Sequence, residues 1–213
     1  MFDGIVTLYV GPNGKKMEMH KKLLASISPE LDKHINNNMK EGIEGKIHFA
    51  EEGEEALGLF SEWAYTGGYT IVDNTPAHQL LDPIKQQQPN TQANADPWLR
   101  LHLHLQLYVF SDKFNIPTLR LLAKSNFSKE INLVELTRGG DAAGLTSVIE
   151  YAYDNLPDSD PVPKFLARYA AWRLGLLRGR DEFIQLISTQ SEFLREFLVN
   201  LTGLGGSKPT LTC

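Results

Sequence analysis

Two histidines, His102 and His104, stand two residues apart in a leucine-rich segment and are the first candidates for a metal site. Residues at this spacing share a face of a β-strand, but on an α-helix they point about 200° apart. No third ligand follows at a suitable spacing, and a zinc site needs three or four. We favour a helix for this segment, for reasons given below. We therefore expect two exposed helix histidines and no metal.

His20 is the residue that a catalytic interpretation would choose as a general base. A base activates a nucleophile only when one is held within reach, and no glycine-flanked serine motif occurs in the sequence. The single cysteine, Cys213, is the last residue, so no intramolecular disulfide and no cysteine-based zinc site can form. We expect a structural role for His20, no enzymatic activity and no cofactor.

Residues 11–16 (GPNGKK) superficially resemble a phosphate-binding loop. They lack the spacing of that motif and lie between two apolar segments that alternate as strands do. Asn13 and Gly14 instead predict a tight hairpin turn, because asparagine and glycine tolerate positive backbone angles. We therefore expect a β-hairpin here.

The composition is typical of a soluble globular protein, with 42% hydrophobic and 22% charged residues in 213 positions. The net charge is −5 and the basic residues are scattered, which disfavours nucleic-acid binding. We find neither a signal peptide nor an apolar run of the ~18 residues that a membrane span needs. The sequence thus predicts no membrane association and a cytoplasmic or nuclear location, where a lone cysteine stays reduced.

The first half of the chain predicts a mixture of strands and helices. After the hairpin, apolar spacing indicates a helix over residues 19–36 that is broken at Ser28-Pro29. A short strand at residues 47–49 and a helix over 54–65, ended by Gly67, follow. Residues 73–97 include the polar run QQQPNTQ and predict a flexible insertion inside the domain.

Residues 98–115 are ambiguous, because five leucines alternate strictly with polar residues while the same segment also contains helical pairs. Pro117 then suits the first turn of a helix that reaches residue 131. Beyond it, apolar spacing predicts further helices up to residue 202, and residues 203–213 form a polar, glycine-containing tail that we expect to be flexible.

Several of these segments together resemble the BTB (POZ) domain, particularly that of fungal BTB proteins. The resemblance rests on HKKLLASISPEL at residues 20–31 after a hairpin, WAYTG at 63–67, and LYVFSDKFNI at 107–116. The last of these motifs is helical in the family, which favours a helix over residues 98–115. The resemblance implies an α+β fold, a small mostly antiparallel sheet with a helical cluster, over residues 1–131. An all-helical extension then covers 132–202.

The resemblance also implies a non-catalytic protein-interaction module. Many BTB proteins bind cullin scaffolds of ubiquitin ligases through a hydrophobic-x-Glu motif after the Tyr-Thr-Gly segment. Ile71 and Asp73 occupy the corresponding places here, with aspartate in place of glutamate. Trp63 and Tyr65 could be interface anchors or core residues, and Tyr69 is the likelier of the three aromatics to be exposed.

The function expected from this resemblance is that of an adaptor that brings a protein partner to a cullin-type ubiquitin ligase. The alternatives are a BTB scaffold or regulatory protein without a link to ubiquitin, and an enzyme, for which no catalytic constellation supports a mechanism. The chain starts at the first strand, without the preceding elements through which many BTB domains dimerise, so we expect a monomer or weak dimer.

Overall fold

The structure, a computed structural model, describes residues 4–36, 45–71, 96–134, 140–201 and 208–211. These residues form a mixed α+β fold in which a small three-stranded sheet accompanies a majority of helices. The described elements are, in chain order, β1 (Ile5–Val10), β2 (Lys15–His20), α1 (Lys21–Ile27), α2 (Pro29–Ile35), β3 (Lys46–Phe49), α4 (Glu54–Thr66), α5 (Pro97–Lys113), α6 (Pro117–Leu133), α7 (Gly140–Asn155), α8 (Pro161–Trp172), α9 (Leu174–Leu177), α10 (Asp181–Thr189) and α11 (Ser191–Leu201).

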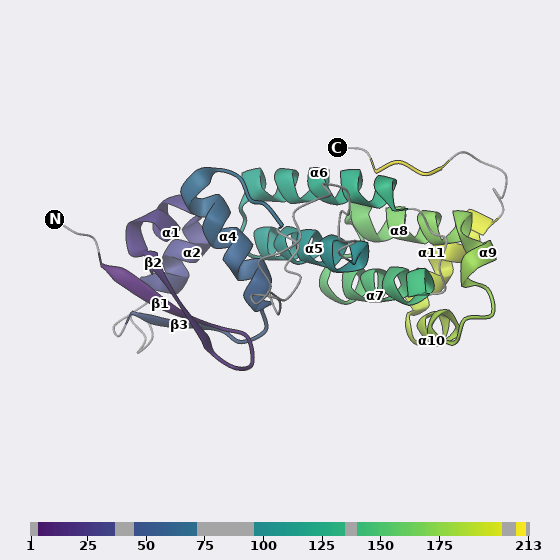
Figure 1. Ribbon diagram of the computed structural model, residues 1–213, viewed down its shortest axis with the longest axis horizontal. Coiled ribbons are helices and arrows are strands. Elements are labelled where there is room, and N and C mark those ends of the chain that lie inside the picture. Colours follow the sequence, from purple (N-terminus) through teal and green to yellow (C-terminus); the bar gives the residue numbers. More distant parts are fainter. Residues whose placement is uncertain (1–3, 37–44, 72–95, 135–139, 202–207, 212–213) are drawn as a thin grey trace, which may run out of the picture.

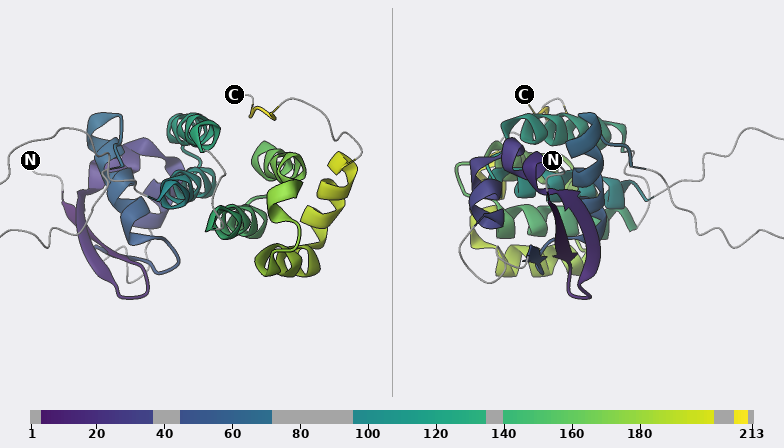
Figure 2. Two further views of the ribbon diagram at one scale, coloured as in Figure 1. Left: turned by 45° about the vertical axis from the view of Figure 1, so that its right-hand side comes forward. Right: turned by 90° about the vertical axis from the view of Figure 1, so that its left-hand side faces the viewer.

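The molecule is elongated (Figure 1). The sheet with α1, α2 and α4 occupies one end, α5 and α6 lie in the middle, and α7 to α11 occupy the other end (Figures 1 and 2). One continuous hydrophobic core nevertheless extends from the sheet to α11. The boundary predicted at residue 131 lies two residues before the end of α6, and the core continues across it.

The predicted hairpin is present, with β1 and β2 antiparallel and Val6 opposite Met19. The positive backbone angles in its turn belong to Gly11 (φ 71°) and Gly14 (φ 60°) rather than to Asn13. The sheet is mixed in the described strands, because β3 pairs parallel to β1 on the side opposite the antiparallel β2. A parallel neighbour needs a crossover connection, and α1 and α2 lie within the segment that links β2 to β3.

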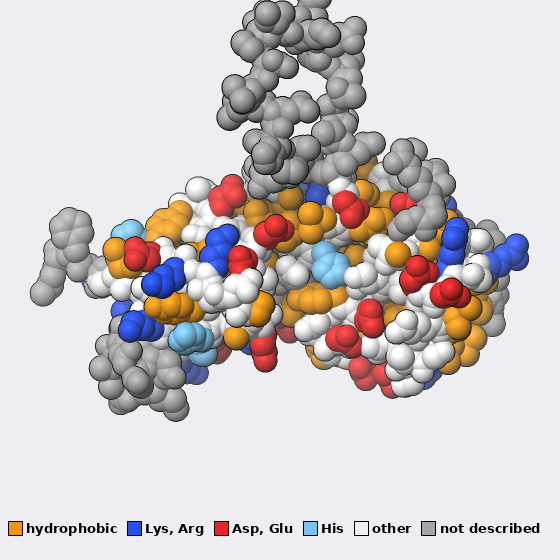
Figure 3. Space-filling model, turned by 60° about the horizontal axis from the view of Figure 1, so that its bottom comes forward, with side chains coloured by type: hydrophobic (Ala, Val, Ile, Leu, Met, Phe, Trp, Pro, Cys, Tyr) orange, Lys and Arg blue, Asp and Glu red, His pale blue; other side chains and the backbone are white. Residues whose placement is uncertain are grey.

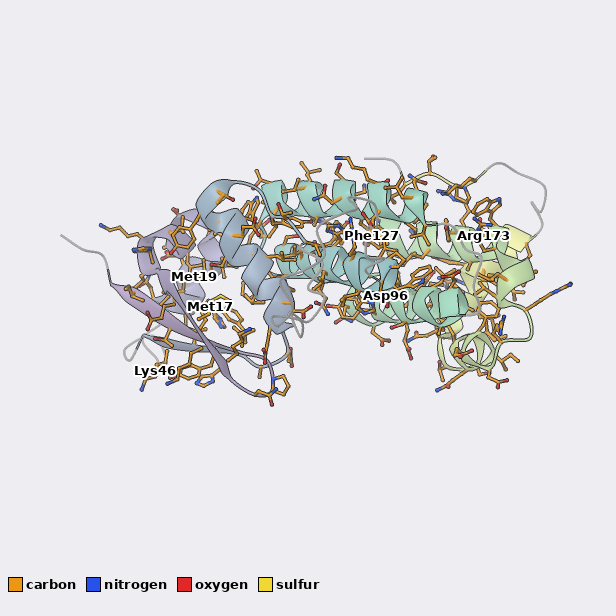
Figure 4. The ribbon with its side chains drawn as sticks, in the orientation of Figure 1. Met17, Met19, Lys46, Asp96, Phe127 and Arg173 are labelled. Atoms are coloured by element: carbon orange, nitrogen blue, oxygen red, sulfur yellow. The ribbon has the colours of Figure 1, made fainter. Side chains whose placement is uncertain are left out.

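The first predicted helix begins two residues later than expected, because Met19 and His20 belong to β2. On β2, Met19 is buried in the hydrophobic core and Met17 is partly buried against it (Figure 4). The predicted break at Ser28 is confirmed. The buried Ser28 hydroxyl accepts hydrogen bonds from the first backbone amides of α2 and donates to the Phe114 carbonyl at the end of α5. The break therefore joins the α1–α2 pair to the centre of the molecule.

The ambiguous leucine-rich segment forms a helix, α5. Asp96 caps it by accepting a hydrogen bond from the Trp98 amide at 3.0 Å, and Pro97 occupies the first turn. Most of its leucines are buried although they alternate in sequence, because α4, α6 and α7 contact this helix. A helix covered on several faces needs apolar residues around its circumference, and strict alternation is one way to provide them.

Two predicted flexible segments fall largely outside the described residues. Of the insertion predicted at 73–97, only Asp96 and Pro97 are described, and both belong to the start of α5. Of the tail predicted at 203–213, residues 208–211 are described and they pack on the molecule, with Leu211 only 7% exposed. These four residues thus have packing contacts that the sequence did not predict, and the flexibility of the tail stays a prediction. A single leucine two positions after a proline gives no periodic signal from which this packing could have been predicted.

Candidate partner-binding surface

The segment that leaves α4 is fastened to the middle of the molecule by Tyr69. Helix α4 ends with Gly67 in the left-handed conformation (φ 80°), which turns the chain back. The Thr70 amide then donates a hydrogen bond to Glu62 of α4 at 3.2 Å. The Tyr69 hydroxyl lies 2.8 Å from Nδ1 of His104 on α5. From the sequence we expected Tyr69 to be the most exposed of the three aromatics and His104 to be exposed. Both expectations were wrong, because Tyr69 is partly buried, Tyr65 is more exposed, and His104 is buried.

Burial fixes the protonation states of this pair. It raises the pKa of Tyr69 to about 12, so its hydroxyl keeps its proton and can donate. Burial, assisted by the positive charge of Arg100, lowers the pKa of His104 to about 4, so its imidazole is neutral at pH 7. In the tautomer that carries its proton on Nε2, the neutral ring can accept a hydrogen bond from the Tyr69 hydroxyl at Nδ1. Tyr69 thus holds the segment on α5 by a bond between two neutral groups.

This arrangement predicts a pH-dependent stability. The folded chain keeps His104 neutral down to about pH 4, whereas in the unfolded chain its pKa returns to 6.5. The unfolded state therefore binds more protons between these pH values, so stability is complete above pH 6.5 and falls as the pH drops towards 4. The expected loss is about 2–3 kcal/mol. Urea unfolding of the wild type and of a His104→Gln variant across this range checks it, and equal pH slopes in the two proteins contradict it.

The other two aromatics of the predicted surface point in different directions from α4. Trp63 is partly buried, and its ring lies 6.1 Å from that of Phe60 against the hydrophobic core. Tyr65 is half exposed, and its hydroxyl lies 2.7 Å from Nδ1 of His20 and accepts a hydrogen bond from the His20 amide at 3.1 Å. Trp63 therefore has a packing role. Tyr65 ties the end of α4 to the end of β2 and gives His20 a structural role.

The structure brings part of the predicted cullin motif to the surface and leaves the rest undescribed. Ile71, two residues beyond the Tyr69 contact, is partly exposed. Asp73 lies outside the described residues. The described part of the predicted surface is thus the end of α4 with Tyr65, followed by residues 67–71. We did not predict that His104 holds this segment through Tyr69, because the position of a histidine on a helix does not indicate which side chain it contacts.

An open cleft of about 630 Å³ lies between the start of α4 and helices α5 and α7. Its lining combines the apolar Trp98, Leu99 and Leu103 with carboxylates of Glu54 and Glu55. Figure 3 shows the molecule turned so that the bottom of Figure 1 comes forward, and on this face acidic and apolar side chains surround a histidine near the middle. No local pattern in the sequence indicates this cleft, because its residues come from three separate segments.

His102 lines this cleft, and its chemistry is that of a packed histidine. Burial alone lowers its pKa, and its ring lies 5.1 Å from that of Tyr151. A carboxylate that oriented His102 as a general base would raise the pKa instead. His102 and His104 are both on α5, so they cannot chelate one ion together. Within the described ranges, no three His, Cys, Asp or Glu side chains gather as a metal-binding group.

Two comparisons with known proteins found no match. No protein-family model matches the sequence, and no curated protein is significantly similar to it. In the part of the chain that the structure describes, no helix is both long enough and apolar enough to cross a membrane. The sequence motifs and the geometry described above therefore carry the functional proposal.

Proposed function

We propose that the chain is a non-catalytic protein-interaction module with a BTB/POZ fold over residues 1–131. The order hairpin, helix pair, strand and helix α4, followed by α5 and α6, supports this assignment because each motif quoted for the family lies on an element of the expected type. HKKLLASISPEL starts at the end of β2 and covers α1 and the first turn of α2. WAYTG ends α4, and LYVFSDKFNI ends α5.

The partner proposed for the surface at residues 67–71 is a cullin-type scaffold, and the chain then acts as an adaptor for a ubiquitin ligase. The observation that carries this proposal is the bond between Tyr69 and His104, which holds the chain in place two residues before Ile71. A fixed backbone lowers the entropy that an interface loses on binding. Ile71 is then presented at the surface as an apolar contact, as in the hydrophobic-x-Glu motif.

Aspartate at position 73 favours a second candidate, a BTB scaffold or regulatory protein without a link to ubiquitin. The Asp73 side chain is one methylene shorter than glutamate, so the acid of the motif reaches less far. An enzyme is the third class. The lowered pKa of His102, with burial as its cause, offers no support for it.

The adaptor proposal predicts that Ile71→Arg weakens cullin binding at least tenfold, because it places an unpaired charge in an apolar contact. Ile71 is partly exposed, so the fold should tolerate the change. Leu121→Arg is the matched control, since Leu121 is 63% exposed on α6 and lies outside the proposed surface.

Affinity purification from a fungal cell extract, with quantification of the cullin that co-purifies, tests this prediction. Wild type and Leu121→Arg should retain a cullin, and Ile71→Arg should lose at least nine tenths of it. Cullin retained equally by all three proteins would contradict the proposed surface. A different stable partner and no cullin would favour the scaffold, and turnover of a small molecule by the pure protein would revive the enzyme class.

A further inference from the structure

Residues 208–211 lie as a segment without regular secondary structure against α6 and α8. Three polar contacts hold it. Arg168 of α8 donates a hydrogen bond to the Thr210 carbonyl at 3.1 Å, and Ser128 of α6 donates to the Leu211 carbonyl at 3.4 Å. Two of the three contacts thus bind main-chain oxygens of the segment, which any peptide of the same conformation would present.

The third contact and the side chains supply selectivity. The Lys208 ammonium group donates to the Asn132 carbonyl of α6 at 2.7 Å. Pro209 and Leu211 are buried, whereas Thr210 between them is exposed. We use the word groove for the surface of α6 and α8 on which the segment lies. This groove buries a proline and a leucine that are two positions apart, and it leaves the side chain between them exposed to solvent. Alternate burial with main-chain hydrogen bonds is the way in which extended peptides are recognised.

Beside Leu211 the segment borders a separate hollow, which lies between α8 and α11. This cavity has a volume of about 480 Å³, a size typical of ligand sites. Its lining includes the apolar Phe165 and the basic Lys164, Arg168 and Arg195, against one carboxylate, Glu196. The surroundings of the cavity thus favour an acidic residue near the buried leucine.

We propose that this groove between α6 and α8 is a docking site for extended peptides of the pattern Pro-x-Leu, with an acidic residue beside the leucine. In the free chain its occupant is the chain's own segment 208–211, which a partner peptide displaces. Six residues, 202–207, connect this segment to the end of α11. So short a tether gives the tail an effective concentration of about 1 mM or more, which a partner has to overcome. This inference is independent of the surface at residues 67–71.

The test measures binding of a fluorescein-labelled peptide, SKPTLE, to the full-length protein by fluorescence anisotropy. A variant that combines Pro209→Asp with Leu211→Asp should release the tail, because it places two charges in buried positions. We expect it to bind the peptide at least tenfold more tightly than the wild type does. Adding Arg168→Glu to this variant should remove most of the gain, and Arg168 is exposed, so the fold should remain.

Peptide controls define the pattern. SKDTDE should not bind, and SKPTLK should bind several-fold more weakly than SKPTLE at low salt. Equal affinity of wild type and released variant for SKPTLE, or equal binding of SKDTDE, would overturn the docking site. Equal affinity for SKPTLK would overturn the acidic preference.

A second measurement uses the wild-type chain and so does not depend on the folding of a variant. A nitroxide on Cys213, the only cysteine in the sequence, reports the mobility of the tail. Millimolar SKPTLE should increase this mobility as it displaces the segment, and SKDTDE should not. Unchanged mobility with SKPTLE would overturn displacement. A wild-type dimer in light scattering, together with a monomeric released variant, would show that copies exchange tails and would overturn the intramolecular occupant.

Discussion

Replacing Asp160 with alanine is expected to lower the free energy of unfolding by about 3–5 kcal/mol. The Asp160 side chain is fully buried and connects three helices. One carboxylate oxygen accepts a hydrogen bond from the Tyr108 hydroxyl of α5 at 2.9 Å and from Arg120 of α6 at 2.8 Å. The other oxygen caps α8 by accepting from the Val162 amide at 2.8 Å. Alanine would leave all three donors without this partner.

Two controls separate this network from a general effect of the mutation. Asp158→Ala removes an exposed carboxylate two residues earlier and should change stability by less than about 0.5 kcal/mol. Asp160→Asn keeps an oxygen that can cap α8 but removes the charge that faces Arg120, so its loss should be intermediate. Urea unfolding followed by circular dichroism measures all three. If Asp160→Ala costs no more than Asp158→Ala, the network does not hold the C-terminal helices on α5 and α6.

Gly144→Ala is expected to cost about 3 kcal/mol or more, although alanine normally favours a helix over glycine. Gly144 lies in α7, and a Cβ atom added there would stand 2.1 Å from Cγ of Trp98 on α5. Cγ is the atom that attaches the indole ring to the side chain, and Trp98 is only 7% exposed. The indole nitrogen also donates a hydrogen bond to the Asp141 carboxylate at 3.4 Å. Either the ring or the helix has to move.

Gly58→Ala provides the matched control, because Gly58 also lies within a helix, α4, and a Cβ there would meet open space. It should be neutral or stabilise the protein by about 0.5–1 kcal/mol. A Trp98→Leu background should reduce the cost of Gly144→Ala, since the clash partner is smaller. Thermal and urea unfolding compare the wild type with Gly144→Ala, Gly58→Ala, Trp98→Leu and the double variant that combines Trp98→Leu with Gly144→Ala. A Gly144→Ala variant as stable as Gly58→Ala would contradict the close approach of α5 and α7.

The sequence predicted those elements whose signals are local. The hairpin followed from alternating apolar residues around a glycine-containing turn, and the break at Ser28 followed from the proline after it. Helix α5 was not determined locally, since its alternating leucines also fit a strand. It is a helix because neighbours cover it on several faces, and this depends on tertiary packing that no window of residues contains.

The candidate surface shows the same limit. Its location after α4 followed from the WAYTG motif, but the support of Tyr69 by His104 joins residues 35 positions apart and had no sequence signal. Both side chains were expected to be exposed. The residue types could not decide this, because tyrosine and histidine occur both at the surface and in the interior of proteins. The docked segment 208–211 was missed for a similar reason, since two buried side chains are too few for a periodic pattern.

Calorimetric titration of the purified full-length chain with a purified cullin scaffold tests the proposed function most directly. The adaptor proposal predicts a complex of one chain per cullin with a dissociation constant of about 10 μM or tighter, since a standard-size interface reaches this range. It also predicts at least tenfold weaker binding for Ile71→Arg and unchanged binding for Leu121→Arg. No binding by the folded wild-type chain, or equal binding by all three proteins, would contradict it.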